Sequence, residues 1–540
     1  MIPGVPPLKV IETITLGSNS ATQRIPASGT IADIAPAGSR HLVVMVNGHG
    51  ESRTTHRLQL NGDTTDGNYL TARMYGSGST LTAQRFETTG MIIGDMPTAT
   101  DQASGGAILI PHYANTHGHK AALSIGGENE LNVFTCEHRW ASVAAVTYAT
   151  VLTGGGGDMT AGTVITLAVV DEDYAIDGAE QILDGANAAM DTVTLPDVAG
   201  DISFIGYLRS AKSATAESWN LNLNGDTTAG NYSHQVFQAD GTTASGWSSA
   251  SSLEIAYHPA DSGTANVFGA YLGSISQHAD GDNHAHLLTF GGFHETTTHS
   301  NIRMYSKRWA NTAAVTSLLI NPVDGTAEDG TMMSYYSSIP KVLLARTAIT
   351  EDTASVTFTL SGLAVPANVK SLRLHWYART DKAAVAEGID LTFNGDSTET
   401  NYHRQEILTL GTWEGASTSN DDNVGATPGN TATANVFSSG TVLIPEYAGT
   451  TYQKARLQMG GRMAANTSSM QAASGRWANT AAITSLTLTP QDGNNFVAGS
   501  FFELEGIGDA GWTGTINGVA NPGKVMGVDA ADIVNIMGVA

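Results

Sequence analysis

Apolar and polar residues alternate along short segments of this chain. Three such segments carry apolar side chains at every second position, namely Leu58 and Leu60, then Trp219, Leu221 and Leu223, then Ile389, Leu391 and Phe393. A period of two places successive side chains on opposite faces of an extended strand. Each segment is therefore predicted to be a half-buried β-strand.

Each predicted strand runs into the same nine-residue turn word. The word is Asn-Gly-Asp-Thr-Thr-Asp-Gly-Asn-Tyr at 61–69, and it returns at 224–232 and, with substitutions, at 394–402. Asn-Gly tolerates positive φ, and an Asp side chain accepts hydrogen bonds from the backbone N–H groups that follow it. We expect a tight turn capped by its own aspartate, after which the tyrosine starts the return strand. The residues concerned are Asn61, Asp63 and Tyr69, then Asn224, Asp226 and Tyr232, then Asn394, Asp396 and Tyr402.

Calcium binding is the alternative explanation of the turn word. Asn61, Asp63 and Thr65 place oxygen atoms at positions 1, 3 and 5 of a loop, as an EF-hand does. The rest of the loop fits badly. The glycine required at loop position 6 is Asp66, Ala229 or Glu399, and the glutamate required at position 12 is Ala72, Gln235 or Gln405. The sequence therefore favours a self-capped turn over a metal site.

A second word follows each turn word at a nearly constant distance. It is Arg-Trp-Ala-Ser-Val-Ala-Ala-Val-Thr at 139–147, and closely similar words stand at 308–316 and 476–484. The gap from the tyrosine of the turn word to this tryptophan is 71, 77 and 75 residues. Because order and spacing are kept together, the chain is predicted to hold three copies of one unit. Trp140, Trp309 and Trp477 are the predicted core anchors of these copies.

The length of one copy sets the domain organisation. At about 165 to 170 residues, a copy is long enough for a domain with its own core and much longer than a solenoid repeat. We place an N-terminal lead at 1–7, repeats at 8–170, 171–340 and 341–510, and a C-terminal segment at 511–540. Sixty glycines and only 14% charged residues are typical of turn-rich all-β domains. The second and third copies also share the word Thr-Ala-Asn-Val-Phe, at 264–268 and 433–437.

The charge balance narrows the classes of partner. The chain has 26 basic and 50 acidic residues, which gives a net charge of −24. Such a surface repels phosphate backbones, so nucleic-acid binding is not expected. Cys136 is the single cysteine, which excludes an intramolecular disulfide and a zinc site with two or more thiolates. Its expected role is that of a small buried apolar residue, and no cofactor is expected.

The first residues lack the pattern of a secretory signal. No cationic region followed by an apolar run occurs at 1–8, and no stretch of 18 apolar residues occurs in the sequence. We therefore expect assembly inside the cytoplasm of the producing cell and no membrane insertion.

Potential metal ligands gather in the second copy. They are His278, Asp280, Asp282, His284, His286, His294 and His299. The spacing from His294 to His299 does not place both histidines on one helix face, as a zincin motif requires. A solvated histidine-rich loop is the favoured interpretation, and no metal site is predicted, with His284 and His286 as weak candidate ligands.

The last 30 residues differ in character from the repeats. Short apolar words that end in Gly-Val stand at 515–519, 524–528 and 535–539. A segment this short cannot form a core alone. We predict that 511–540 packs on a neighbouring chain and drives homo-oligomerisation, as a trimer or a higher symmetric array.

Taken together, the words of the chain resemble domains found in structural proteins of tailed bacteriophages. The resemblance rests on the strand into NGDxxxxNY, on RWxxTAAIT, and on 495–500 leading into 504–507. The closing Ile-Asn-Gly-Val words are similar to segments of phage tail and appendage proteins. The likeness covers nearly the whole chain and is clearest in the third copy, while the first and second copies depart from it at 162–167 and 330–335. It implies β-sandwiches of jelly-roll type and a place in a virion, and it implies no specific activity.

Three classes of function follow. The favoured one is a non-enzymatic virion structural protein on the exterior of a phage particle, either a tail fibre, appendage or host-adhesion component or, alternatively, a capsid decoration protein. Its partners would be other virion proteins and host-surface glycans. The second class is a carbohydrate-binding cell-surface adhesin, in which Trp247 and Trp413 stack on sugars, although both are equally explained as loop anchors. An enzyme with two catalytic carboxylates is disfavoured, because the sequence holds no Gly-x-Ser-x-Gly elbow and no HExxH motif.

Overall fold

The predicted strand before each turn word is present in all three copies. In the computed structural model these strands are β4 (Thr54–Leu60), β16 (Ala216–Leu223) and β28 (Ala386–Phe393). In β16 and β28 buried and half-buried residues alternate strictly, with the apolar side chains on the buried face. The period-two interpretation of these segments is therefore confirmed.

The structure describes residues 5–98, 102, 104–128, 131–184, 187–196, 200–279, 281–296, 299–337, 343–367, 369–451, 453–462, 468–508, 515–516, 519–520, 524–525 and 528–529.

The strands form three pairs of antiparallel sheets, each with one eight-stranded and one four-stranded sheet, so the chain is all-β. We call the first pair unit 1. Its larger sheet has the order β1-β12-β3-β8-β9-β10-β5-β6 and its smaller sheet the order β2-β11-β4-β7. Besides β4, its strands are β1 (Leu8–Thr15), β2 (Thr22–Ile25), β3 (Leu42–Gly48), β5 (Tyr69–Ser77), β6 (Thr80–Thr88), β7 (Met91–Met96), β8 (Ser104–Ile110), β9 (Lys120–Glu128), β10 (Asn132–Trp140), β11 (Ala149–Thr153) and β12 (Val164–Val170).

Unit 2 repeats this order with β13-β24-β15-β20-β21-β22-β17-β18 and β14-β23-β16-β19. Its further strands are β13 (Gln181–Ile182), β14 (Val193–Thr194), β15 (Ile202–Leu208), β17 (Tyr232–Asp240), β18 (Thr243–Ser249), β19 (Glu254–Pro259), β20 (Gly269–Ser276), β21 (Ala285–Thr296), β22 (His299–Trp309), β23 (Ser317–Pro322) and β24 (Met332–Ser337).

Unit 3 has the order β25-β36-β27-β32-β33-β34-β29-β30 and β26-β35-β28-β31, so the three units share one topology. Its further strands are β25 (Leu343–Ala348), β26 (Val356–Thr359), β27 (Val369–Ala378), β29 (Tyr402–Leu410), β30 (Trp413–Ser419), β31 (Asn423–Pro428), β32 (Ser438–Ile444), β33 (Lys454–Arg462), β34 (Ser469–Trp477), β35 (Ser485–Pro490) and β36 (Phe501–Gly508).

Helical segments in the described residues are short. They are α1 (Ile31–Ile34), η1 (Glu172–Tyr174), η2 (Ala229–Asn231), η3 (Leu360–Gly362) and η4 (Glu399–Asn401). Among the residues described, no helix is long and apolar enough to cross a membrane.

Each unit has a core between its two sheets. The core of unit 1 includes Leu58, Leu60 and Trp140, and separate clusters of the same kind fill units 2 and 3. Cys136 is buried, as expected, and burial raises the pKa of its thiol to about 12.

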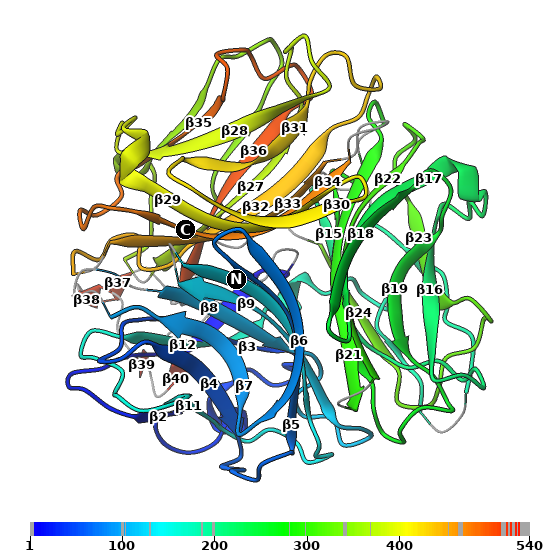
Figure 1. Ribbon diagram of the computed structural model, residues 1–540, viewed down its shortest axis with the longest axis vertical. Helices are drawn as coiled ribbons and strands as arrows, with labels where there is room; N and C mark the ends of the chain where they lie inside the picture. Colours follow the sequence, from blue (N-terminus) through cyan, green and yellow to red (C-terminus); the bar gives the residue numbers. More distant parts are fainter. Residues whose placement is uncertain are drawn as a thin grey trace.

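A fourth cluster is shared by all three units. Their eight-stranded sheets face a common centre, with the units arranged around it (Figure 1). The cluster joins Leu109 and Leu123 of unit 1 to Leu272 and Phe290 of unit 2 and to Leu457 of unit 3. The large sheets are therefore covered on both faces, which explains why β10 and β33 are buried at every position.

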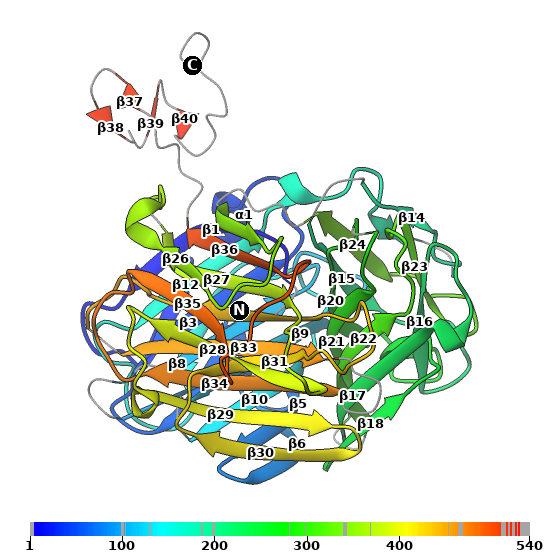
Figure 2. The same cartoon turned by 90° about the horizontal axis from the view of Figure 1, so that it is seen from above.

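Three hairpins meet at one end of the molecule. They are β5–β6, β17–β18 and β29–β30, and their outer strands β6, β18 and β30 contact one another (Figure 2). The Gln405 amide of unit 3 donates to the carbonyl oxygen of Gly78 and accepts from the Gly78 N–H, both at 3.0 Å, across the tip of the unit 1 hairpin. Gln235 of unit 2 donates to the Gly411 carbonyl oxygen of unit 3 at 2.8 Å. Each of these units thus holds the hairpin tip of a neighbour.

The segment after unit 3 contains two short hairpins. β37 (Thr515–Ile516) pairs with β38 (Val519–Ala520), and β39 (Lys524–Val525) pairs with β40 (Val528–Asp529). The rest of the predicted assembly segment 511–540 lies outside the described residues, so its role stays a prediction.

Candidate functional site

The turn word and the Arg-Trp word form one hydrogen-bonded network. In unit 1, Asp63 Oδ1 accepts from the Thr65 N–H at 2.9 Å, and Oδ2 accepts from Asn68 Nδ2 at 2.8 Å. The same Oδ2 accepts from Trp140 Nε1 at 2.7 Å. The corresponding bonds from Trp309 to Asp226 and from Trp477 to Asp396 are both 2.8 Å.

These tryptophans occupy the unit cores: Trp140, Trp309 and Trp477 are 3%, 1% and 1% exposed. Sequence reasoning treated the two words separately and missed the bond between them. The sequence did hold a hint of this contact, because both words recur three times at a nearly fixed separation.

The side chains of the asparagine and the tyrosine of the turn word accept hydrogen bonds from backbone N–H groups in other parts of the chain. Asn61 has a positive φ of 51°, and its Oδ1 accepts from the Thr147 N–H at 2.8 Å. Asn224 and Asn394 bind Thr316 and Thr484 in the same way, at 2.8 and 2.7 Å. The hydroxyl oxygens of Tyr69, Tyr232 and Tyr402 accept backbone N–H bonds from Leu60, Leu223 and Phe393, at 2.8, 2.9 and 2.9 Å.

This network explains the electrostatics of the turn aspartates. Partial desolvation acts to raise the pKa of Asp63 and Asp226, but the hydrogen bonds from tryptophan, threonine and asparagine outweigh it and lower both pKa values to about 2. Because N–H groups of the chain itself occupy these carboxylates, the arrangement is that of a self-capped turn and not of a set of metal ligands.

The word Thr-Ala-Asn-Val-Phe lies at a contact between units. The carbonyl oxygen of Asn266 in unit 2 accepts from the His119 N–H of unit 1 at 2.8 Å, and that of Asn435 in unit 3 accepts from the His284 N–H of unit 2 at 2.9 Å. Phe268 stacks on Tyr207 with ring centroids 4.4 Å apart, and the Tyr207 hydroxyl donates to the His119 carbonyl oxygen at 2.6 Å.

A buried arginine holds this word in place. Arg379 Nη1 donates to the carbonyl oxygens of Thr433 and Val436 at 2.7 and 3.0 Å, and Arg209 does the same for Thr264 and Val267 at 2.7 and 2.8 Å. Both arginines were missed in the sequence, although each stands 15 residues before the first residue of a turn word.

The histidines of unit 2 do not share a site. His286 lies in β21 with Nδ1 2.7 Å from Ser439 Oγ and Nε2 3.0 Å from Ser306 Oγ. His278 lies against the carbonyl oxygens of Gly200 and Pro196 at 2.9 and 3.0 Å, and His284 is half-buried. Within the part of the chain that the structure describes, no group of three or more His, Cys, Asp or Glu side chains is placed to hold a metal ion.

The solvated-loop interpretation of this segment is wrong for three of its histidines. His278, His286 and His294 are 1%, 1% and 0% exposed. His286 and His294 belong to β21, an inner strand of a sheet covered on both faces. Burial lowers the pKa of both to about 3, so their rings are neutral at physiological pH.

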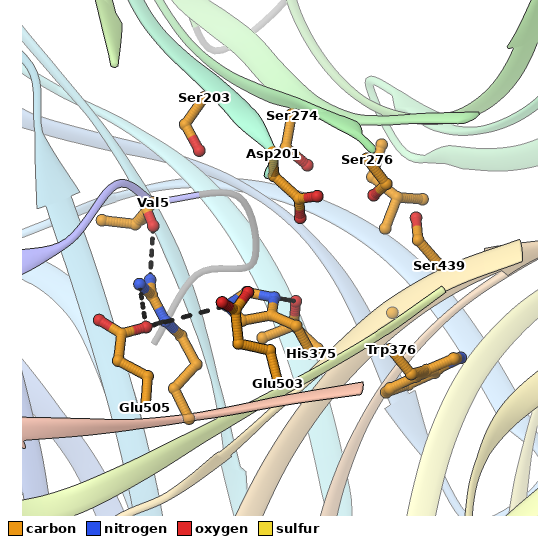
Figure 3. A pocket seen from close by; sticks show the side chains of 14 residues that line it. Val5, Asp201, Ser203, Ser274, Ser276, His375, Trp376, Ser439, Glu503 and Glu505 are labelled. Carbon is orange, nitrogen blue, oxygen red and sulfur yellow. Dashed lines mark hydrogen bonds and ion pairs between the residues drawn. The ribbon is translucent and has the colours of Figure 1, made fainter. Parts of the chain in front are cut away.

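A small polar pocket lies where unit 3 packs against unit 2 (Figure 3). Its volume is about 20 Å³, which is room for about one water molecule. Its charged and serine lining consists of Arg373, His375, Glu503, Glu505 and Ser439 from unit 3 and Asp201, Ser203, Ser274 and Ser276 from unit 2.

Two parts of this pocket behave differently. Arg373 forms an ion pair with Glu505 and also donates to the Val5 carbonyl oxygen, so these charges are compensated. Glu503 and Asp201 lie near each other in the other part of the pocket, and their carboxyl groups repel. Burial raises the pKa of Glu503 to about 8, and repulsion from Asp201 adds to the rise. Glu503 is therefore largely protonated near neutral pH.

The charged lining of this pocket is not repeated in unit 1, where a smaller pocket of about 10 Å³ lies at the contact with unit 3. In unit 1 the positions on β3 and β12 that match Arg373, His375 and Glu505 are Val43, Met45 and Ala168, which belong to the shared apolar cluster. The charged side chains therefore replace apolar ones at equivalent places in the fold.

An open cleft of about 310 Å³ lies on unit 3, between the edge of its small sheet and strand β29. At its centre, Arg404 Nη1 donates to Asn423 Oδ1 at 2.7 Å, and its Nη2 lies 3.1 Å from Asp421 Oδ2. Glu406 accepts from Ser417 Oγ at 2.7 Å. Sequence reasoning did not find this cleft, because its residues come from at least five separate parts of the third copy. They are Lys382, Ala386, Glu387, Gly388, Arg404, Glu406, Leu408, Asp421, Asn423, Gly425, Ala426, Arg462, Gln471 and Gln491.

Comparison with known proteins identifies no relative. No protein-family model matches the sequence, and neither does any curated protein. Among solved structures, the translocator domain of the autotransporter NalP from Neisseria meningitidis aligns at 7% identity and a TM-score of 0.10, over 85% of this chain and 91% of that one. OccK7 (OpdD) from Pseudomonas aeruginosa aligns at 7% identity and a TM-score of 0.10, over 84% and 100%. Such scores carry no argument about fold or function.

Proposed function

We propose that the protein is a non-enzymatic structural protein on the exterior of a tailed-bacteriophage particle, serving as a tail fibre, appendage or host-adhesion component. The observation that carries the proposal is the arrangement of three sheet pairs of one topology around a shared apolar cluster. Because the shared cluster ties the three units together, we expect the chain to be rigid. Three like units around one centre also give it the approximate threefold form of a trimer. The resemblance of the turn word and the Arg-Trp word to phage structural domains supports the same role.

We further propose that each unit is a jelly roll. Without the hairpins β5–β6 and β9–β10, the sheets of unit 1 have the orders β1-β12-β3-β8 and β2-β11-β4-β7, so the chain crosses repeatedly between two four-stranded sheets. Double-sheet folds of this kind occur in viral capsid and lectin domains. Since one fold serves many functions, this supports the virion role only by analogy.

The proposed partners are other virion proteins and further copies of this chain, joined as a trimer or a higher symmetric array. Residues 511–540 are the proposed contact, with assembly in the host cytoplasm. The net charge of −24 supports a place away from nucleic acid.

Labelling of intact particles tests the proposal. Antibodies against the purified protein should decorate virions in electron micrographs, and the protein should be found by mass spectrometry in gradient-purified particles. Label on the tail supports the appendage role, and label spread over the head supports the alternative, capsid decoration. Protein confined to unassembled lysate would contradict both.

A truncated chain ending at Gly508 tests the assembly segment. It should keep the secondary structure of the full chain and lose oligomerisation or incorporation into particles. Normal assembly of the truncated chain would place the contact on the sheet pairs instead.

A further inference from the structure

The space between the two sheets is filled in units 1 and 2 at the end where unit 3 has its cleft. In unit 1, Phe134 packs with Ile92 and Cys136, with Tyr75 and Phe86 against them. In unit 2, Arg303 lies 4.3 Å from the centre of the Tyr257 ring, and Tyr257 packs on Phe293 with centroids 6.0 Å apart. Aromatic rings therefore close this space in both units.

The matching residues of unit 3 leave the space open. Phe134, Arg303 and Gln471 each stand six residues before the tryptophan of the Arg-Trp word, and they occupy the same ladder position. Ala426 stands where unit 2 has Tyr257, since both lie two residues before the proline that ends the strand. Loss of these rings leaves the cleft of about 310 Å³, a volume in the range of small-molecule sites.

An exposed tryptophan lies beside the same cleft. Trp413 is 54% exposed and pairs with Leu410 across the β29–β30 hairpin. Leu408 and Glu406, which line the cleft, pair with Gly415 and Ser417 on the same strand face. A Cβ on Gly415 would lie 2.6 Å from the Trp413 ring, so the indole lies over Gly415, next to the Leu408 position.

The tryptophan is also specific to unit 3. The matching first residues of β6 and β18 are Thr80 and Thr243. Trp247, the other tryptophan in a comparable stretch, is partly covered, with Arg303 5.4 Å from its ring centre. The open cleft and the exposed indole are thus two departures from the repeat, and both lie at one place on the molecule.

The lining of the cleft is polar and balanced in charge. It includes three basic side chains, those of Lys382, Arg404 and Arg462, and three acidic ones, those of Glu387, Glu406 and Asp421. Arg404 is paired with Asp421 and lies 3.4 Å from Glu406, so its charge is compensated within the site. A ligand with a net charge would gain little here, whereas a neutral ligand with many hydroxyl groups would find both donors and acceptors.

We infer that the cleft of unit 3, with Trp413 at its rim, binds a neutral saccharide. The flat indole covers the C–H face of a sugar ring, because burial of this apolar surface is favourable. Arg404, Asn423, Glu406 and Gln471 present polar groups toward the hydroxyls. The inference names a ligand class and a site for the proposed adhesive role. The binding itself is argued from the cleft, and only its biological purpose rests on the proposed function.

Binding by the purified full-length chain tests the inference. Saturation-transfer NMR and titration calorimetry are run with the methyl glycosides of glucose, galactose, mannose and N-acetylglucosamine, and with glucuronate as a charged counterpart. We expect saturable binding of at least one neutral glycoside with a dissociation constant below about 10 mM. Trp413→Ala and Gln471→Phe should each weaken it about tenfold or more, the first by removing the platform and the second by restoring the ring that unit 1 has. Val323→Ala, at a valine of unit 2 that is 50% exposed, is the control and should bind as the unchanged chain does.

The outcomes separate the inference from the proposed function. Thermal melts show whether each variant is folded, and Trp413→Ala is expected to fold because its side chain is exposed. No saturable binding of any neutral glycoside, binding unchanged in both variants, or binding of glucuronate alone would overturn the saccharide site. A failure of particle labelling leaves this result intact, and a failure of saccharide binding leaves the virion role intact.

Discussion

At the scale of single residues, one hydrogen bond joins the two recurrent words of each copy. The turn aspartate accepts from the indole N–H of a tryptophan more than 75 residues away in the sequence, as Asp63 does from Trp140. The bond fixes the end of β4, β16 or β28 on the core of its own unit. The sequence predicted the turn, the aspartate cap and the tryptophan anchor, because each is carried by a local pattern. It did not predict their contact, since no local pattern encodes which two distant groups meet.

A double-mutant cycle measures this bond in unit 3. Asp396→Ala removes the acceptor, and Trp477→Phe removes the donor while keeping an aromatic ring. Hydrogen bonds to charged groups contribute about 1.5 to 3 kcal/mol, so we expect a coupling free energy of that size in chemical denaturation. The matched control pairs Trp477→Phe with Asp352→Ala, at an exposed aspartate of the same unit, and should show additive effects. Additivity in the first cycle would show that the bond contributes nothing to stability.

A single residue of the pocket between units 2 and 3, Glu503, is predicted to make the stability of the fold depend on pH. The pKa of Glu503 is about 8 in the folded protein against 4.5 for an ordinary glutamate. A group whose pKa is raised by folding contributes stability that is fully present below pH 4.5 and lost as the pH rises through about 8. Asp201, Glu505, Arg346 and Arg373 are the charged groups that act on it.

Glu503→Gln keeps the shape of the protonated carboxyl and cannot ionise. We expect the melting temperature of the unchanged protein to fall more than that of the variant between pH 4.5 and about pH 8. Glu351→Gln, at an exposed glutamate of the same unit, is the control and should follow the unchanged protein. Parallel curves for Glu503→Gln and the unchanged protein would show that Glu503 is ionised throughout this range.

At the scale of elements, the loops before β20 and β32 join neighbouring units. The word Thr-Ala-Asn-Val-Phe, seen in the sequence only as a shared string, presents its Asn266 or Asn435 carbonyl oxygen to the preceding unit. The strands were predictable because period-two burial is local. The sheet order and the contacts between units were not, because they depend on pairings between distant segments.

Arg379 is predicted to hold the loop of unit 3. Its guanidinium donates to four backbone carbonyl oxygens, those of Asn430, Ala432, Thr433 and Val436. Arg379→Met leaves these acceptors without their donor, so we expect a loss of about 3 kcal/mol in the free energy of unfolding and faster amide exchange at 430–437. Lys370→Met, at an exposed lysine of β27, should change both measurements little. An unchanged exchange rate at 430–437 would mean that the loop is held by other contacts.

At the scale of the whole molecule, the shared cluster makes three similar units into one body. The repeat length led to the prediction of domains with their own cores, and each unit has such a core. Burial of the second face of each large sheet could not be predicted from the sequence. A strand that is apolar on both faces shows only a continuous apolar run, which does not say what covers either face. The polar pocket between units 2 and 3 and the open cleft on unit 3 both occur where the sequences of the three copies differ.

The shared cluster predicts that the three units unfold together. Each large sheet buries apolar side chains such as Leu123, Leu272 and Leu457 against the other two units, and loss of one unit would expose them to water. Calorimetry of the full chain should therefore show one transition, with equal van't Hoff and calorimetric enthalpies. Trp477→Ala, which opens a cavity in the core of unit 3 and costs about 3 to 5 kcal/mol, should shift this whole transition and not split it. Residues 341–510 expressed alone should aggregate, because one face of their large sheet is left uncovered. Three separate transitions, or a soluble and monomeric third unit with the melting temperature of the full chain, would show that the shared cluster couples nothing.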